Sequence, residues 1–491
     1  MFYTSTFFGY ESPLVQLEID VRHGIPSVDL VGLADSCVKE SRERVLTALR
    51  NSEITIPQER ILVCLNPCDL KKDNDVSFPL AMAMADSSNP VLFDVGIMGE
   101  LELSGRVRPV RGVYAFIQTL RENGIKKIIL PNECRKIAET LDSSILEDSE
   151  FLFVSNLKEC FRLYADENNY INLSSCSRDS DEILFNTDED EEIQNYLNLH
   201  NNCGSTVRAL QIALSGKHNI MGYGELYEEL FYNLDVALNP LLTDEELSAV
   251  RRLYSLSGID KTDCTAPLRR PHFTATIEGM CGGGINCRPG EISLAHNGIL
   301  YLGKASEFRS SCLQMLRVPL ESRRISLSRA GHSTVYPADF SLHLFNSPCP
   351  CGNYGSNNRI CLCSAKSVEQ FWNKISAPIL DRIEIKIHTV TEKETELSLN
   401  ELREPIRKAF EIQRKRKIYN GKFSSSDIIK YCKLDESAEN FKSHLSLSDR
   451  EEKNLVKVAL TIANMDGREF ISLPDIEESY SLINFNLGNL L

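Results

Sequence analysis

One acidic stretch constrains the fold of this chain more than any other feature, because it divides the sequence into two parts. Residues 166–195 contain the runs Asp179–Glu182 and Asp188–Glu192, which are almost entirely acidic and show no apolar periodicity. Charge of one sign without periodicity is typical of a linker, and the start of a solvated helix is the alternative. The 491 residues also exceed what one hydrophobic core normally accommodates. We therefore predict separate domains on either side of residues 166–195.

Residues 1–165 alternate apolar runs with amphipathic stretches, which predicts an α/β domain. Val15–Val21 alternates as a half-buried strand does, and Arg60–Leu65 and Lys127–Pro131 have the composition of buried strands. Asp35–Leu49 places apolar residues at helical spacing behind an Asp/Ser cap.

By the same criteria, residues 196–390 form a second α/β unit and residues 391–491 a helical one. The apolar run Gly298–Leu302 predicts a central parallel strand of the second unit. Beyond residue 390 the sequence is rich in charge, and Glu401–Tyr419 and Arg450–Met465 are its clearest helices. The predicted fold class is therefore a multidomain α/β protein with a helical C-terminal part.

The charge balance excludes a general affinity for nucleic acid. The chain carries 54 basic and 69 acidic side chains, for a net charge of −15, so any contact with DNA requires a local basic patch or pore. It has no run of about 18 apolar residues, and Met1–Thr6 lacks the order of a signal peptide. We expect a cytoplasmic protein without membrane contact, in which most of the 16 cysteines are reduced.

Four cysteines form a candidate metal site. Cys349 and Cys351 are followed, after nine residues, by Cys361 and Cys363. Two thiolate pairs joined by a loop suit tetrahedral zinc, and the intervening Gly352–Asn358 is rich in turn residues. The C-x-C spacing is tighter than the usual C-x₂-C, so free thiols are the alternative to a structural zinc ion.

Several strings, taken together and in order, resemble the ComM and YifB type of magnesium-chelatase-like AAA+ ATPase. The resemblance spans nearly the whole chain, and Arg288–Gly298 is its least ambiguous string. The other strings are Gly32–Asp35, Val38–Val45, Asn66–Leu70, Gly99–Gly105, Arg108–Gly112, Pro348–Gly352 and Leu380–Ile383.

The resemblance implies three structural parts and a role in DNA processing. The N-terminal part, residues 1–165, is expected to have the fold of ribosomal protein S5 domain 2, which is related to the Lon protease domain. After the acidic linker, residues 196–390 are expected to form an AAA+ core and residues 391–491 a helical lid. Members of the family form hexameric rings that use ATP and magnesium and promote branch migration of DNA during natural transformation.

This chain departs from the family where ATP should bind. A phosphate-binding loop needs the pattern G-x-x-x-x-G-K-[ST], in which the lysine and hydroxyl hold the phosphates and magnesium. Here the corresponding segment runs Gly222, Tyr223, Gly224 and Glu225, with no lysine nearby. We interpret Gly222 and Gly224 as an ordinary turn, and Glu225, Glu228 and Glu229 as negative charge where phosphate should lie.

The metal-binding carboxylates are also replaced, whereas two arginines are retained. At the end of the predicted central strand, Gly303 and Lys304 replace the family's Asp-Glu pair, and Glu307 lies too far along to serve as the base. The family's water-orienting asparagine falls on Ser347, with Asn346 one residue early. Arg382 matches the family's arginine finger and Arg450 its sensor arginine, unless both persist only as partners in salt bridges.

Other residues are weaker candidates for function. Arg288 and His296 lie in the region that faces the ring pore in related proteins and are candidate DNA contacts. The basic cluster Arg414–Lys417 either touches phosphate or is a solvated helix face. Ser77 would be the nucleophile in a Lon-like protease, but the segment expected to carry its lysine, Arg111–Ala115, has none, so we predict no proteolysis.

The sequence therefore predicts a ComM-like protein with poor or no ATP hydrolysis. It is expected to form a homo- or hetero-oligomeric ring that contacts DNA, with ATP and magnesium implied by the family alone. The alternative is a scaffold or regulatory protein that acts through protein contacts without hydrolysis.

Overall fold

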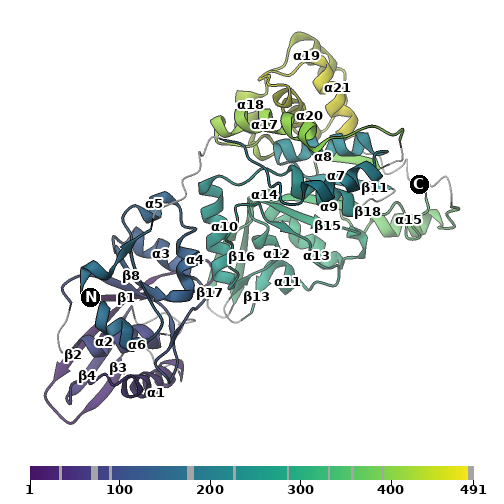
Figure 1. Ribbon diagram of the computed structural model, residues 1–491. Coiled ribbons are helices and arrows are strands. Elements are labelled where there is room, and N and C mark those ends of the chain that lie inside the picture. The colour runs from purple at the N-terminus through teal and green to yellow at the C-terminus, as the bar shows by residue number, and fades with distance from the viewer. Residues whose placement is uncertain are drawn as a thin grey trace.

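The computed structural model arranges the chain as an N-terminal sheet, a central parallel sheet and a C-terminal group of helices (Figure 1). It describes residues 1–31, 36–67, 76–87, 91–173, 182–224, 228–284, 287–329, 332–354, 359–389 and 392–484. The multidomain α/β class and the helical C-terminal part predicted from sequence are confirmed. None of the helices within these ranges is both long and apolar enough to cross a membrane.

The N-terminal part is built on an eight-stranded mixed sheet in the order β10-β9-β8-β5-β1-β2-β4-β3. Helix α2 is almost entirely apolar and its side chains are buried, so it forms the centre of this part. The strands are β1 (Phe2–Ser5), β2 (Leu14–Arg22), β3 (Ser27–Val31), β4 (Arg60–Asn66), β5 (Val95–Ile97), β8 (Lys127–Pro131), β9 (Glu150–Val154) and β10 (Ile171–Asn172). The helices are α1 (Ser36–Asn51), α2 (Ser77–Asp86), α3 (Val113–Glu122), α4 (Arg135–Ala138), α5 (Ser143–Leu146) and α6 (Leu157–Leu163), with the hairpin β6 (Glu100–Leu101) and β7 (Val107–Arg108).

The central part contains a five-stranded, fully parallel sheet in the order β12-β15-β18-β11-β19. Its strands are β11 (Ile220–Gly224), β12 (Leu268–Arg269), β15 (Ile299–Leu302), β18 (Ser341–Asn346) and β19 (Ile385–Thr389). Side chains from both faces are buried, as expected for parallel strands covered by helices on each side. The predicted central strand Gly298–Leu302 is therefore confirmed as β15.

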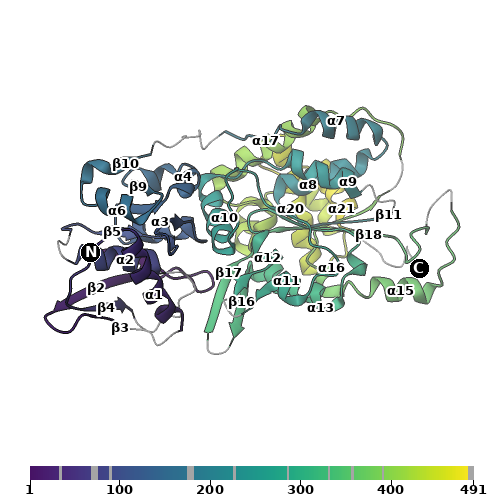
Figure 2. The same ribbon diagram turned by 60° about the horizontal axis from the view of Figure 1, so that its bottom comes forward.

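Helices cover both faces of this sheet (Figure 2). Ile299 and Tyr301 of β15 face α8 and α9, whereas Leu300 and Leu302 face α10 to α13. The helices are α7 (Asp190–Leu199), α8 (Gly204–Gly216), α9 (Glu228–Leu238), α10 (Asp244–Ser257), α11 (Ile277–Cys281), α12 (Glu291–Leu294), α13 (Ser310–Gln314), α14 (Pro319–Ser322), α15 (Ala365–Trp372) and α16 (Ala377–Leu380). Two hairpins, β13 (Gly282–Gly283) with β14 (Arg288–Pro289) and β16 (Arg324–Arg329) with β17 (His332–Pro337), extend from the core.

The C-terminal part consists of helices packed on α8 and the sheet. The predicted helices correspond to α17 (Leu399–Arg416) and α20 (Asp449–Met465), and the others are α18 (Ser425–Tyr431), α19 (Glu436–Ser443) and α21 (Leu473–Ile483). Helix α20 begins at a capping box, in which Ser448 accepts from the backbone of Glu451 and the Glu451 carboxylate accepts in return. We refer to residues 399–483 as the lid.

Both ends of the predicted acidic linker are packed against the rest of the chain. Strand β10 pairs with β9, and α7 begins at Asp190. The Asp190 carboxylate accepts two hydrogen bonds from Arg403 of α17, both at 2.6 Å. Residues 190–195 of the predicted linker thus form the start of a helix, which was the alternative interpretation. The domain boundaries themselves stay a prediction.

Candidate functional site

The segment expected to bind phosphate is part of the central strand β11. Gly222 and Gly224 pair with β19, so the interpretation of these glycines as a turn is wrong. A Cβ atom at Gly222 would lie 2.6 Å from the Phe345 ring on the neighbouring strand, which explains the glycine there. Tyr223 stacks on His388, with ring centroids 5.0 Å apart. Glu225 lies outside the described residues.

Helix α9 carries apolar residues where the phosphate loop needs its lysine and hydroxyl. Counted from Gly224, the spacing of the phosphate-loop pattern puts Leu230 at the lysine position and Phe231 at the hydroxyl position. Both side chains are completely buried. The Phe231 ring stacks on Phe345 with centroids 4.9 Å apart, and Tyr301 stacks on Phe345 at 5.3 Å. The two positions that need a lysine and a hydroxyl are therefore packed into the hydrophobic core.

The acidic residues at the start of α9 are neutralised by an arginine. Arg270, which follows β12, donates to Glu228 at 2.8 Å and to Glu229 at 2.9 Å. Hydrogen bonds to these carboxylates raise the pKa of Arg270 further, and the guanidinium lies over the Tyr232 ring at 5.0 Å. This arginine near the start of α9 is therefore already paired with protein carboxylates.

The end of β15 lacks the carboxylates that would hold magnesium. Gly303 abuts the carboxylate of Glu228, so no side chain fits there without displacing that group. Lys304 is exposed and adopts a left-handed conformation with φ of 52°. Glu307 is also exposed, in the short turn that follows. The loss of the metal site stays a prediction.

Asn346 has a structural contact in place of the expected catalytic one. Its Oδ1 accepts a hydrogen bond of 3.0 Å from the backbone N–H of Ser306, and the residue is fully buried. Ser347 follows at the end of β18 and is half-buried. Asn346 therefore connects β18 to the turn after β15.

The two retained arginines lie together at the opposite edge of the sheet. Arg382 precedes β19 and forms a 2.6 Å ion pair with Glu321, and its Nη1 also donates to the Pro378 carbonyl. Arg450, exposed at the start of α20, has no carboxylate within ion-pair distance among the described residues. Both arginines line one cavity of about 180 Å³ between the core and the lid.

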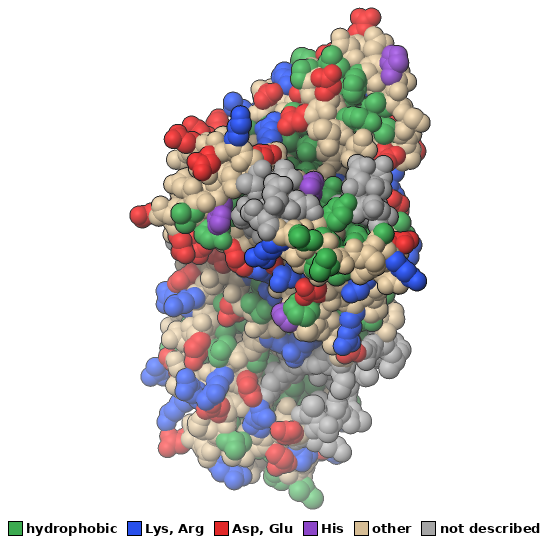
Figure 3. Space-filling view, turned by 90° about the vertical axis from the view of Figure 1, so that its right-hand side faces the viewer, with side chains coloured by type: hydrophobic (Ala, Val, Ile, Leu, Met, Phe, Trp, Pro, Cys, Tyr) green, Lys and Arg blue, Asp and Glu red, His purple; other side chains and the backbone are tan. Residues whose placement is uncertain are grey.

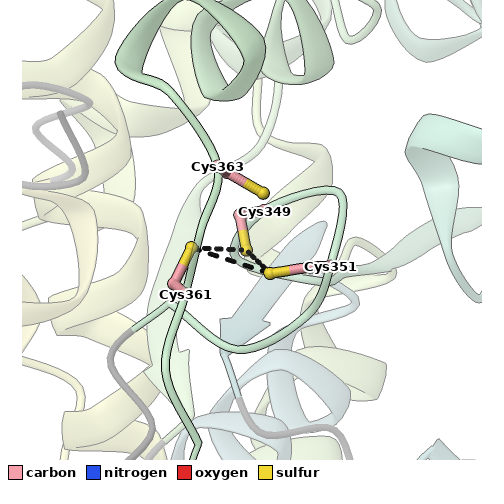
Figure 4. A group of neighbouring side chains, drawn as sticks. All are labelled: Cys349, Cys351, Cys361 and Cys363. Atoms are coloured by element: carbon pink, nitrogen blue, oxygen red, sulfur yellow. Dashed lines mark hydrogen bonds between the residues drawn. The ribbon is translucent and has the colours of Figure 1, made fainter.

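The four cysteines predicted to bind zinc meet in space (Figure 4). Their sulfur atoms all lie within 4.8 Å of one another, and three of the distances are 3.3 to 3.6 Å. Four thiolates around zinc at about 2.3 Å are separated by roughly 3.8 Å, so the cluster fits this ion. A hydrogen bond from the backbone of Asn353 and one with Cys349 lower the pKa of Cys351 to about 6, which favours the thiolate form that binds metal.

The two candidate DNA contacts have different surroundings. Arg288 is exposed on β14 and has no ion-pair partner within the described ranges. His296 is largely buried; its Nδ1 accepts a 3.1 Å hydrogen bond from the backbone of Asp339, and burial lowers its pKa to about 4. A neutral ring does not form an ion pair with phosphate, so Arg288 is the stronger of the two candidates, and a DNA contact at His296 stays a prediction.

Other basic residues are largely engaged within the protein. Arg269 forms two 2.7 Å hydrogen bonds with Glu291, and His272 contacts Thr274. In the cluster Arg414–Lys417, Arg414 donates to the Leu241 carbonyl and Arg416 pairs with Glu469 at 2.8 Å. On the face of the molecule shown in Figure 3, the described basic and acidic side chains are interspersed.

The serine considered for proteolysis is a structural residue. Ser77 begins α2, is completely buried, and accepts a 3.1 Å hydrogen bond from the backbone of Leu101. Its hydroxyl therefore positions the β6–β7 hairpin and is closed to a peptide substrate.

The sequence reasoning missed the aromatic packing of α9 and the basic lining of the cavity. Arg323, Lys422 and Lys457 lie around that cavity beside Arg450. One signal was present in the sequence, since Arg450 and Lys457 are seven residues apart and lie on one face of a helix. The contact between Phe231 and Phe345 joins residues more than a hundred positions apart, and no local pattern reveals it.

Comparison with known families agrees with the order of motifs. The family model described as magnesium chelatase, subunit ChlI, matches residues 201–397, that of subunit ChlI of Mg-chelatase matches 17–134, and that of the ChlI C-terminal part matches 396–482. Competence protein ComM of Haemophilus influenzae is 30% identical over 97% of this chain and 96% of its own length. The chain belongs to the ComM and YifB family of magnesium-chelatase-like proteins.

Further relatives place the ComM-type similarity along the entire chain and a Lon-type similarity in a minor part. YifB of Escherichia coli is 28% identical over 98% of this chain and 96% of its own length. Lon protease 1 of Thermus thermophilus is 29% identical over 31% of this chain and 21% of its own length. The five-stranded parallel sheet of this ComM-family chain is consistent with an AAA+ core.

Proposed function

We propose that this chain is a ComM-family protein of DNA processing that has lost ATP hydrolysis and acts as a non-hydrolysing ring subunit. The start of α9 carries the proposal: Leu230 and Phe231 are buried, and Glu228 and Glu229 hold Arg270. A triphosphate needs cations and a bound metal ion. At this position it would meet carboxylates and aromatic rings.

The size of the loss decides the enzymatic question. Removing a single electrostatic stabiliser of a transition state typically lowers the rate by roughly 10²- to 10³-fold. Here the lysine, the metal-binding carboxylate and the base are all replaced. Even though such losses are not additive, turnover falls to background.

Calorimetric titration of ATP with magnesium into the purified chain tests the proposal. We expect no saturable heat that depends on magnesium and no magnesium-dependent phosphate release. A hydrolysing ComM-family protein, titrated in parallel, is the positive control. Saturable binding of ATP that requires magnesium, or turnover that co-purifies with the chain, would overturn the proposal.

A mixed ring is a second function that one observation favours. Arg382 and Arg450 persist together beside one cavity although the chain's own phosphate loop is lost. We infer that the chain supplies Arg382 to ATP bound by a hydrolysing subunit of the same family, because an arginine finger acts across a subunit interface. In such a ring the arginine must leave Glu321.

Titration of this chain into a hydrolysing family member tests the mixed ring. Wild-type chain should change the ATPase rate of the mixture, and the Arg382→Ala variant should not. Arg106→Ala, which removes an exposed arginine of the N-terminal part paired with Glu133, is the matched control. If the Arg382→Ala and Arg106→Ala variants change the ATPase rate of the mixture equally, Arg382 does not act as an arginine finger. That outcome would leave the proposed loss of the chain's own ATPase activity untouched.

Contact with DNA is proposed at Arg288, the exposed arginine of β14. The logarithm of the DNA-binding constant falls linearly with the logarithm of salt concentration, and an arginine that binds one phosphate contributes about one unit to this slope. Arg288→Ala should therefore weaken binding to DNA and lower that slope by about one unit, whereas Arg106→Ala should not. If neither substitution has an effect, Arg288 does not contact DNA.

The cysteine cluster is proposed to hold a structural zinc ion in the loop after β18. Cys349, Cys351, Cys361 and Cys363 supply four sulfur ligands, which leaves no open position for catalysis. The N-terminal part is proposed to have the ribosomal S5 domain 2 fold without proteolytic activity, in keeping with the buried Ser77.

A further inference from the structure

The cavity between the core and the lid contains basic side chains that differ in how they are paired. Lys217 forms an ion pair with Glu246 at 2.6 Å, and Lys422 forms one with Asp339 at 2.8 Å. Lys457 has no carboxylate within ion-pair distance among the described residues, and it donates a long hydrogen bond of 3.4 Å to the Gly421 carbonyl. The cavity is therefore lined by an ammonium group that forms no close ion pair with the described residues.

Four acidic side chains line the same cavity, and two of them form ion pairs with other cations. Asp339 pairs with Lys422 and Glu321 with Arg382. Glu384 accepts a 3.0 Å hydrogen bond from the backbone of Asn219, and Asp381 is exposed. Among the described residues, none of these carboxylates lies within ion-pair distance of Lys457.

The neighbours of Lys457 increase the local positive charge. Burial lowers the pKa of Lys457; Glu384 opposes this shift, and Arg323 and Lys422 lower the pKa further. Arg323 lies 3.9 Å from Asp339, at the outer limit of an ion pair, and donates to the Lys422 carbonyl. Like charges that converge in a partly buried space favour a bound anion.

We propose that this cavity binds a phosphate group, held by Lys457, Arg323 and Lys422 between the lid and the core. Its volume of about 180 Å³ is several times the roughly 30 Å³ that one water molecule occupies in the liquid. Lysine and arginine bind phosphate oxygens through strong, charge-assisted hydrogen bonds. The site is distinct from the trans-acting role inferred for Arg382, because its ligand binds within a single chain.

A bound phosphate would join two parts of the fold. Lys457 belongs to α20 of the lid, whereas Arg323 follows α14 of the core. An anion bound between them stabilises the folded chain, because the unfolded chain lacks the site. The free energy of unfolding rises with the logarithm of the ratio of phosphate concentration to Kd.

Thermal unfolding in phosphate tests the proposal with Lys457→Gln and a matched control. The control, Lys453→Gln, lies one turn away on α20 and removes an exposed lysine paired with Asp449. At equal ionic strength set with chloride, inorganic phosphate should raise the Tm of wild-type protein and of Lys453→Gln. Lys457→Gln should bind phosphate about tenfold more weakly.

The stability of the variant without phosphate separates a ligand site from a structural lysine. Removal of an unpaired cation relieves repulsion, so Lys457→Gln without phosphate should be at least as stable as wild type. Arg323→Gln is a second variant, with the same expected loss of phosphate binding. Two results would overturn the proposal. The first is a wild-type Tm that is no higher in phosphate than in chloride, and the second is an equal rise of Tm in Lys457→Gln and Lys453→Gln.

Two further arms identify the source of the phosphate and exclude the arginine-finger site. ADP that binds more tightly than inorganic phosphate, and loses this advantage in Lys457→Gln, indicates a nucleotide; otherwise the ligand is free phosphate. Arg382→Ala should retain phosphate binding. If Arg382→Ala loses binding as completely as Lys457→Gln, the phosphate lies at the finger and the proposed site is wrong.

Discussion

The carboxylate of Glu228 occupies the space that a side chain at Gly303 would need. Glu228 begins α9 and Gly303 follows β15, so the two positions correspond to the phosphate loop and the metal-binding strand end. The two losses are therefore physically coupled, since the acid in one motif fits only because the other motif ends in glycine.

Restoring aspartate at position 303 alone should destabilise the protein. Gly303→Asp places a second carboxylate against Glu228 and forces that flexible side chain to move away, at a cost of about 1 kcal/mol. In the double variant with Glu228→Ala, much of this loss should be recovered. Urea unfolding of the two single variants and the double variant gives the coupling free energy, and additive effects would contradict the contact.

Restoring the phosphate-loop residues should damage the fold without restoring ATP binding. Leu230→Lys with Phe231→Ser introduces a charge and a cavity at two fully buried positions. We expect a loss of about 4 kcal/mol or more in the free energy of unfolding. Ile429→Lys, at a side chain that is 83% exposed, is the control and should change stability by less than about 0.5 kcal/mol. A double variant as stable as wild type would show that Leu230 and Phe231 are not packed in the core as described.

Metal removal should be visible in the fluorescence of the only tryptophan of the chain, Trp372. Its Nε1 donates a 3.1 Å hydrogen bond to the Pro348 carbonyl, next to Cys349, and the side chain is buried. We expect about one zinc ion per chain, and a red shift of the emission when a chelator removes it. Cys361→Ser with Cys363→Ser should show both effects without chelator, and Cys64→Ser neither. Metal-free protein with unshifted emission would indicate free thiols.

Mild acid should destabilise the protein through two enclosed histidines. Burial lowers the pKa of His218 to about 3, with Lys457 and Lys422 lowering it further, and burial lowers the pKa of His296 to about 4. Unfolded histidine has a pKa near 6.5. Because the folded pKa values lie below the unfolded one, the stability these groups contribute is complete above about pH 6.5 and is lost as the pH falls toward 4.

The variant His218→Gln measures this effect. Each histidine should account for about 1.4 kcal/mol of lost stability per pH unit below 6.5. Between pH 7.5 and 5.5, the free energy of unfolding of His218→Gln should therefore fall by about 1.4 kcal/mol less than that of wild type. His23→Gln, at an exposed side chain, should behave as wild type. Identical losses in all three proteins would mean that His218 is protonated in the folded state.

Local patterns predicted much of the fold, and long-range contacts account for the errors. The strand at Gly298–Leu302 and the cysteine cluster depend on apolar runs and spacing within a short segment, and both match the structure. Gly222 was misinterpreted because its role is set by the ring of Phe345, more than a hundred residues away. The hydrogen bond of His296 also comes from a distant residue, since the backbone of Asp339 donates to its Nδ1.

The fastening of the lid onto the core bears on how the chain transmits force. Gly421 packs directly against the Lys217 carbonyl, Lys422 donates to the Phe340 carbonyl at 2.7 Å, and the His218 ring contacts Thr461. A motor protein converts chemical energy into work by swinging one part against another about a hinge. Here contacts from both parts hold the joint between lid and core together. A force on the lid is therefore transmitted directly to the central sheet.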